Sequence, residues 1–268
     1  MNKVLGVIGC GWLGLPLAKK LVEQGFRVKG TTTSKEKMSV LSKLGIEPYW
    51  VQISETEILG DILDFLEGVD TLVVNIPPKL RGKGPKENYV RKIGLLSTAI
   101  ESSSVREVLF VSSTSVYGDD QGEVDEETIP EPTSEAGKQL LATEELLKEN
   151  TLFKMTVVRF AGLIGPDRHP ITMLSGRTDL SGGNAPVNLI HLDDCIGIIT
   201  SIIQKNEWGQ IINGVYPVHP TKESYYTQKA LEKGLNPPGY AKKILENPKK
   251  ITSCSLFITK YYRFSTAI

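Results

Sequence analysis

The chain has 268 residues, with 31 Lys plus Arg and 31 Asp plus Glu, so its formal net charge is zero. A balanced charge provides no long-range field that would attract nucleic acid or an anionic membrane surface, so we expect neither partner. The three cysteines are widely spaced and the three histidines form no ligand-type pair, so the sequence predicts no disulfide framework and no metal site.

The first apolar stretch of the chain is Val4–Ile8. It is too short for the apolar region of a signal peptide, and no later run approaches the ~18 residues that a membrane span needs, so we expect a cytoplasmic protein. Similar short runs, rich in β-branched side chains, recur at residues 26–31, 49–53, 71–75, 108–112, 155–160 and 187–191. Their alternation with helix-length segments predicts a doubly wound α/β fold around a parallel sheet.

The segments between these strands carry helical signals. Leu13, Leu17 and Leu21 recur at helical spacing until Gly25 ends the segment, and Pro16 falls near the first turn, where a missing N–H costs little. We expect further helices from a Ser34 cap through residue 44, over residues 87–102 and 133–149, and from an Asp193 or Asp194 cap through residue 204.

Three stretches are expected to be loops, namely residues 77–85, 118–133 and 162–186. The last is long, and long loops in compact domains are often lids or binding segments. Its Arg168 and Arg177 could bind an anionic substrate group bidentately, although both could equally be solvated loop charges. Residues 251–262 mix apolar and aromatic side chains, and we expect them to pack as a last strand and helix.

The turn after the first strand has the spacing GxGxxG, formed by Gly9, Gly11 and Gly14. Gly9 permits a tight turn, Gly11 lets the backbone approach a diphosphate, and Gly14 lets the following helix pack closely on the sheet. Trp12 and Leu13 lie where free amides and the helix dipole attract phosphate. The pattern predicts a dinucleotide-binding turn, with a plain glycine-rich turn as the alternative.

The end of the second strand lacks the acid that usually holds the ribose 2′-hydroxyl of NAD. The chain has Thr31, Thr32, Thr33, Ser34 and Lys35 there instead. Hydroxyl groups and a lysine suit a 2′-phosphate better than a carboxylate would. We therefore favour NADP as the cofactor, with NAD as the alternative, and assign the four hydroxyl residues to its site. The same hydroxyls could also serve only as a turn and a helix cap.

Residues 111–118, Val-Ser-Ser-Thr-Ser-Val-Tyr-Gly, resemble the extended short-chain dehydrogenases/reductases, the family of nucleotide-sugar epimerases and dehydratases. Asn75 at the end of the fourth strand, residues 159–166 and residues 188–194 resemble further segments of that family in the same order, so the resemblance covers about residues 3–235. It implies a Rossmann-type fold with a small C-terminal substrate-binding lobe, and a homodimer formed through two helices of each subunit.

The resemblance also assigns sites and domains. Ser113 matches the catalytic hydroxyl that contacts the substrate oxygen. We assign the cofactor, in addition, to Asn75, Ile76, Pro77 and Ser112. Residues 1–160 would form the dinucleotide-binding core. Residues 161–268 would supply a late strand and helices to that core and a small substrate lobe, without a clean boundary.

The chain departs from the family at its Tyr-Lys catalytic pair. Aligned without a gap, the Tyr position is Ala136 and the Lys position is Leu140. General acid–base catalysis is typically worth about 10²–10⁴-fold, so the family's usual mechanism cannot be assumed. This loss is similar to an atypical branch of the family, and the opening Gly-Cys-Gly-Trp-Leu-Gly resembles a bacterial group within it. Lys138 or Tyr117 could supply the proton, although an exposed lysine and a packed tyrosine are the simpler interpretations.

Three other residues have a structural and a functional interpretation. Arg159 could pair within the fold or face a substrate phosphate. His191 could be structural or an acid–base group. Cys10 could pack inside the glycine turn or be a redox-sensitive thiol whose pKa the helix N-terminus lowers.

Two functions remain open from the sequence. The first is an NADP(H)-dependent oxidoreductase or epimerase that acts on a carbohydrate-like or nucleotide-linked small molecule through Ser113 and a further proton donor. The second is a non-catalytic NADP(H) binder that acts as a redox sensor or scaffold. The missing Tyr-Lys pair favours the second, whereas the retained Ser113 and the long loop favour the first.

Overall fold

The computed structural model describes residues 3–78, 80 and 86–268. Within these residues, one central sheet has the strand order β11-β8-β6-β5-β1-β2-β3-β4. All neighbours are parallel except β3 and β4. The strands are β1 Val4–Ile8, β2 Arg27–Thr32, β3 Glu47–Ile53, β4 Ile58–Gly60, β5 Thr71–Val74, β6 Glu107–Ser113, β8 Lys154–Phe160 and β11 Ile211–Gly214. The Rossmann-type doubly wound fold expected from the sequence is confirmed.

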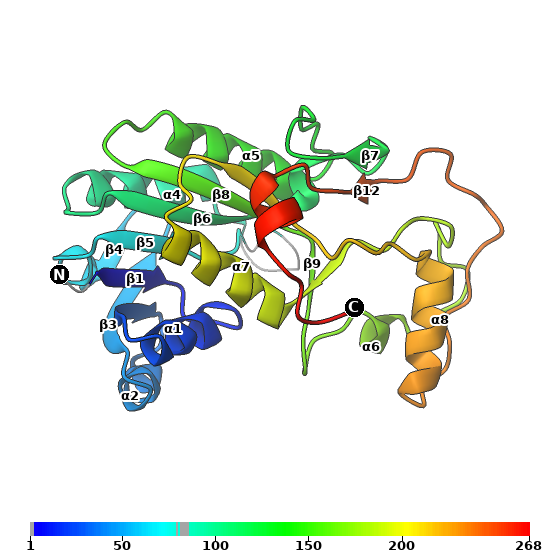
Figure 1. The fold of residues 1–268 in the computed structure, drawn as a ribbon, viewed down its shortest axis with the longest axis horizontal. Helices are drawn as coiled ribbons and strands as arrows, with labels where there is room; N and C mark the ends of the chain where they lie inside the picture. The colour runs from blue at the N-terminus through cyan, green and yellow to red at the C-terminus, as the bar shows by residue number, and fades with distance from the viewer. Residues whose placement is uncertain (1–2, 79, 81–85) are drawn as a thin grey trace.

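Helices cover both faces of this sheet (Figure 1). Helix α1 (Gly14–Glu23) packs beside α7 (Leu192–Lys205), and α4 (Tyr89–Glu101) packs beside α5 (Glu135–Lys148). Strand side chains such as Leu5 and Val7 are fully buried, which is why these strands appear in the sequence as continuous apolar runs. Helices α2 (Met38–Lys43) and α3 (Ile62–Leu66) flank the β2–β3 side of the sheet.

The predicted stripe of helix α1 is confirmed. Leu13, Leu17 and Leu21 are all buried, and Pro16 lies in the first turn, where its missing N–H has no partner to lose. Gly25 ends the helix with a φ of 86°, and the amide of Phe26 donates back to the carbonyl of Leu21. Glycine adopts this left-handed backbone conformation at the end of a helix more readily than any other residue.

Two predicted caps are wrong. Ser34 begins a separate 3₁₀ turn, Lys35–Lys37, and its hydroxyl donates to the Glu36 carboxylate instead of capping a helix. Helix α7 is capped by His191, whose Nδ1 accepts the amide of Asp193 at 3.2 Å, and neither aspartate caps it. A ring nitrogen can replace a carboxylate here because it offers the same acceptor to the first free N–H groups.

The C-terminal part of the chain forms a small lobe beside the sheet (Figure 1). It holds a two-stranded parallel sheet of β9 (Gly162–Ile164) and β10 (Leu189–His191), with helices α6 (Ile171–Leu174) and α8 (Lys222–Glu232). The segment 187–191, expected with the buried strands of the main sheet, therefore pairs outside it. The two edge strands of the main sheet are β11 and β4, and the sequence analysis missed both. The segment expected as the loop 162–186 contains β9 and α6.

The remaining predicted loops and the tail differ in outcome. Most of residues 79–85 lies outside the described residues. The loop 118–133 contains β7 (Glu123–Val124), which pairs with β12 (Lys250–Ile251). The tail then forms a π-helical turn, Phe257–Tyr261. The strand and helix expected in this tail are thus both present in short form.

The buried carboxylate of Asp194 holds the end of the chain against helix α7. It accepts hydrogen bonds from the Tyr262 hydroxyl at 2.9 Å, from the Ser265 amide at 2.7 Å and from the Thr266 amide at 3.2 Å. A buried carboxylate needs such donors to offset its lost hydration. The role of this aspartate is therefore to dock the C-terminal tail rather than to cap the helix.

The surroundings of His169 predict that the stability of the small lobe depends on pH. Its Nδ1 accepts the amide of Ile171 at 3.1 Å, and its Nε2 lies 3.0 Å from the Tyr225 hydroxyl. Burial, followed by the nearby Lys233 and Lys229, lowers the pKa of His169 to about 4. The unfolded chain, whose histidine pKa is near 6.5, then binds a proton that the folded chain does not bind between about pH 6.5 and 4.

We therefore expect stability to fall as the pH drops through this window. Thermal unfolding at pH 7, 6 and 5 should show a falling Tm for the parent chain and a shallower fall for His169→Gln. Because burial also lowers the pKa of His219, the variant should not flatten the profile completely. Identical pH slopes in the two proteins would contradict this assignment.

No helix in the described part of the chain is both long enough and apolar enough to cross a membrane. Among the same residues, no group of three or more His, Cys, Asp or Glu side chains is arranged to hold a metal ion.

Candidate functional site

The glycine turn lies at the carboxyl end of β1, next to the end of β5, where the strand order of the sheet reverses. Gly9 has a φ of 95°, and a Cβ there would lie 2.4 Å from the carbonyl oxygen of Asn75. A Cβ on Gly14 would lie 2.1 Å from the Gly9 carbonyl oxygen, whereas one on Gly11 would meet nothing within 4 Å. Gly9 and Gly14 are thus required by the fold, and Gly11 faces open space.

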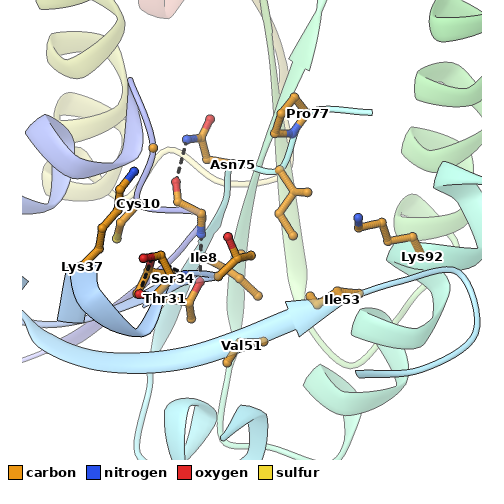
Figure 2. A pocket seen from close by; sticks show the side chains of 15 residues that line it. Ile8, Cys10, Thr31, Ser34, Lys37, Val51, Ile53, Asn75, Pro77 and Lys92 are labelled. Carbon is orange, nitrogen blue, oxygen red and sulfur yellow. Dashed lines mark hydrogen bonds between the residues drawn. The ribbon is translucent and has the colours of Figure 1, made fainter. Parts of the chain in front are cut away.

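Two side chains clamp the first residue of this turn (Figure 2). The Thr31 Oγ1 accepts the Gly9 amide at 3.0 Å, and the Asn75 Nδ2 donates to the Gly9 carbonyl at 3.1 Å. The amide of Cys10 donates to the Thr31 carbonyl at 3.0 Å. The ends of β2 and β5 therefore hold the turn in one conformation.

The amides of Trp12 and Leu13 complete the turn. Within the described part of the chain, neither amide donates a hydrogen bond to a protein acceptor. Both lie just before helix α1, so they add free N–H groups to the positive end of its dipole. This combination provides an anion site beside the open face of Gly11.

Cys10 has no features of a reactive thiol. Its side chain is buried within the core, its Sγ lies near the Val7 carbonyl, and burial raises its pKa to about 12. A thiol that stays protonated at neutral pH is a poor nucleophile. The packing interpretation of this residue is confirmed.

A cavity opens next to the turn, at the ends of β1, β2 and β5. It is lined by Ile8, Gly9, Cys10, Gly11, Thr31, Thr32, Thr33, Ser34, Lys37, Val51, Ile53, Asn75, Ile76, Pro77 and Lys92. Most of the residues that the sequence analysis assigned to the cofactor therefore surround one cavity. Trp12, Leu13, Gly14 and Ser112 are not among the lining residues.

The lysine side chains at this cavity are Lys37 and Lys92, not the Lys35 expected from the sequence. The Lys35 Nζ lies 4.8 Å from the centre of the Trp50 ring, and Lys35 does not line the cavity. Lys37 lines it, and Figure 2 shows Lys37 and Lys92 on opposite sides. The Thr32 hydroxyl accepts the Ser34 amide, and the Ser34 hydroxyl donates to Glu36 and lowers the pKa of that carboxyl. Part of the hydroxyl cluster thus shapes the turn.

A second cavity lies at the ends of β6 and β8 and extends to the small lobe. Its polar lining comes from six separate segments of the chain and includes Ser113, Ser115, Asp119, Ser134, Arg168, Asn188, Lys222, Tyr226 and Lys249. The Ser113 Oγ accepts the Ser115 amide at 3.2 Å, so the hydroxyl proton is available to a ligand. The Lys249 Nζ donates to the Tyr117 carbonyl at 2.7 Å and lies 2.9 Å from the Asp119 carboxylate.

Ser112 and Tyr117 are also among the residues that line this cavity, and their hydroxyl groups belong to a buried hydrogen-bond network. The Ser112 hydroxyl donates to Glu144 at 2.5 Å, and Arg159 pairs with the same carboxylate at 2.6 Å. Arg159 also donates to the Tyr117 hydroxyl at 2.8 Å, and that hydroxyl donates to the Asp125 carbonyl at 2.7 Å. Burial raises the pKa of Tyr117. Arg159 therefore pairs within the fold, and the Tyr117 hydroxyl is held by Arg159, by the Asp125 carbonyl and by the Oδ1 of Asn213 at 3.2 Å.

Helix α5 begins next to the second cavity, because its N-cap residue Ser134 is part of the lining. A Cβ on Gly137 would lie 2.1 Å from the Ser115 carbonyl oxygen, so the helix packs tightly on the segment after Ser113. Ala136 is partly buried, Leu140 is buried, and Lys138 is exposed. None of these three lines either cavity.

The sequence analysis missed Lys37, Lys92, Lys222, Tyr226 and Lys249 as lining residues. Lys37 lies two residues after Lys35, the lysine that the sequence analysis expected at the cofactor site. The residues 35–37 form a 3₁₀ turn that was not predicted, and Lys37 instead of Lys35 lines the cavity. Lys222, Tyr226 and Lys249 come from segments with no motif, so no local signal marks them.

Comparisons with known proteins agree with this geometry. The model of a family described as NAD(P)H-binding matches residues 9–189. The protein YeeZ of Escherichia coli strain K12 is 36% identical over 251 residues, which cover 93% of this chain and 90% of YeeZ. YtcB of Bacillus subtilis strain 168 is described as an uncharacterized UDP-glucose epimerase. It is 25% identical over 231 residues, which cover 76% of this chain and 73% of YtcB.

A similar solved structure is UDP-glucuronic acid 4-epimerase from Bacillus cereus in complex with NAD. It superposes with a TM-score of 0.78 at 18% sequence identity, and the superposition covers 98% of this chain and 92% of the epimerase chain. At this level of identity the similarity concerns the fold.

Proposed function

Because the chain belongs to the NAD(P)H-binding family, we propose that it is an NADP(H)-dependent oxidoreductase or epimerase whose cofactor lies over the turn from Gly9 to Gly14. The observation that carries this proposal is the open face of Gly11, beside the free amides of Trp12 and Leu13. A diphosphate placed there would receive N–H donors at the positive end of helix α1. Thr31 and Asn75 would support the site by holding Gly9.

The cofactor would supply a hydride acceptor or donor at the boundary between the two cavities. Its adenosine half would occupy the first cavity, which β1, β2 and β5 form. Ile76 and Pro77 would line its path from the end of β5. The second cavity would then hold the substrate beside Ser113.

The choice of NADP over NAD depends on Lys37. This side chain lines the first cavity, and the segment from Thr31 to Ser34 contributes hydroxyl groups and no carboxylate to it. We expect Lys37→Ala to weaken NADPH binding about tenfold, as for the loss of one charge-assisted hydrogen bond, and to change NADH binding by less than about twofold.

Calorimetric titration with NADPH and with NADH checks this expectation. Lys35→Ala is the matched control, because it removes a charge two residues away that lies over Trp50 instead of the cavity. Equal effects of the two substitutions, or tighter binding of NADH than NADPH to the parent chain, would assign the site to NAD.

Ser113 is the group that we assign to the substrate oxygen. Its Oγ is oriented by the Ser115 amide, which leaves its proton for a carbonyl or hydroxyl oxygen in the second cavity. We assign Tyr117 to the fold, because its hydroxyl is already bonded to Arg159 and to the Asp125 carbonyl. The substrate would be a small carbohydrate-like or nucleotide-linked molecule.

The function is tested by following the absorbance of NADPH with a panel of carbohydrate-derived carbonyl compounds. We expect turnover with at least one of them, and a loss of about 100-fold for Ser113→Ala, in the range of general acid–base effects. The control is Thr133→Ala, which removes a hydroxyl group from an exposed residue of the same cavity lining.

The alternative is a non-catalytic NADP(H) sensor or scaffold. Ala136 and Leu140, which carry no acid–base group, favour this alternative. Tight NADPH binding without consumption of NADPH by any compound in the panel would argue against the oxidoreductase. If no compound were epimerised either, the result would support the sensor or scaffold over the enzyme.

A further inference from the structure

The side chain of Trp12 leaves the glycine turn and contacts the small lobe. Its Nε1 donates to the Asp167 carboxylate at 3.0 Å. A Cβ on Gly165 would lie 2.8 Å from the Trp12 Cζ2, so the indole packs directly on the backbone of this glycine. One residue therefore joins the expected diphosphate site, through its amide, to the segment 165–168, through its ring.

The indole also supports the guanidinium of Arg168. The Arg168 Cζ lies 4.9 Å from the centre of the Trp12 ring, and Gly165 and Arg168 exchange two backbone hydrogen bonds of 2.8 and 3.2 Å. Stacking on a ring face fixes a guanidinium without using its N–H donors. In the part of the chain that the structure describes, no carboxylate lies within ion-pair distance of Arg168 and no side-chain hydrogen bond involves it.

The surroundings of Arg168 favour an anion. Among the residues that the structure describes, Arg168, Lys222 and Lys249 line the second cavity together with a single carboxylate, that of Asp119. This carboxylate is already paired with Lys249 at 2.9 Å. The cavity therefore has an excess of positive charge, and a planar fork of five donors is available at its wall.

We propose that Trp12 is a positioning residue that holds Arg168 as a bidentate anchor for a carboxylate or phosphate group of the substrate. The proposal rests on the proposed function only in assigning the second cavity to the substrate. It gives Trp12 a role for its side chain that is separate from the role of its amide. It also restricts the substrate to molecules that carry an anionic group.

The test uses the full chain saturated with NADPH, so that the diphosphate site is filled, and titrates it by calorimetry with glucose 6-phosphate and with glucuronate. We expect one or both probes to bind, and Arg168→Met and Trp12→Leu to weaken that binding at least tenfold. The probe that binds identifies the anion as phosphate or carboxylate. Trp12→Phe, which keeps a ring face and loses the bond to Asp167, should stay within about threefold of the parent chain.

The matched control is Arg177→Met, an exposed arginine of the same segment that does not line the cavity. It should bind the probes as the parent chain does. Absence of binding by both probes to the parent chain, or unchanged binding by Arg168→Met and Trp12→Leu, would overturn the proposal. Titrations with the same probes in the absence of NADPH distinguish a failure of the proposed function from a failure of this inference. A chain that binds the probes through Arg168 and does not bind NADPH would sink the proposed function and retain this inference.

Discussion

Gly11→Asp is expected to weaken NADPH binding by about 100-fold or more while leaving the fold intact, because it places a carboxylate where the diphosphate would lie. A Cβ at this position meets nothing within 4 Å, so the substitution causes no clash. The Tm should therefore stay within about 2 °C of the parent value, as for an exposed substitution. Calorimetric titration with NADPH and a thermal scan of the same preparation measure the two quantities.

The neighbouring glycines provide the contrast. Gly14→Ala would bring a Cβ to 2.1 Å from the Gly9 carbonyl oxygen, and Gly9→Ala would place one 2.4 Å from the Asn75 carbonyl oxygen at a φ of 95°. Both should lower the Tm, since backbone must move in each case. If Gly11→Asp bound NADPH as tightly as the parent chain, the cofactor would not lie over this turn.

The parts of the fold that the sequence predicts well have local causes. A strand buried on both faces must be apolar along its length, so Val4–Ile8 is visible from composition alone. The glycine turn is visible because Gly14 is required by its contact with Gly9 and because Gly9 has a positive φ, a conformation that favours glycine. The contact of Gly9 with Asn75, at the end of β5, is by contrast a long-range one. Even Pro16, an apparent objection to helix α1, follows from the rule that the first turn has unpaired amides.

The parts that the sequence does not predict depend on distant contacts. Strand β11 is short and contains Asn213, whose side chain donates to the Thr252 carbonyl, so its place in the sheet is fixed by long-range pairing. Lys249 reaches the second cavity only because β12 pairs with β7. The contact between Trp12 and Arg168 joins the turn after β1 to the segment after β9. The spacing of residues along the sequence cannot predict such long-range contacts.

Glu144→Gln is expected to lower the free energy of unfolding by about 3–5 kcal/mol, the usual cost of breaking a buried ion pair. The Glu144 carboxylate accepts hydrogen bonds from Arg159 at 2.6 Å and from Ser112 at 2.5 Å, and both charged side chains are buried. The neutral amide would leave the Arg159 charge without a counter-charge, in surroundings that penalise it. Urea unfolding of the two proteins measures the difference.

Glu145→Gln is the matched control, because the adjacent side chain is exposed and should change stability by less than about 0.5 kcal/mol. A double variant, Glu144→Leu with Arg159→Met, tests the cause: it removes both charges, so its loss should be smaller than the sum of the single losses. Since Arg159 also donates to the Tyr117 hydroxyl, the double variant should still be less stable than the parent chain. Strictly additive losses would mean that the two charges do not depend on each other, and the network behind Ser113 would then be held by packing rather than by this ion pair.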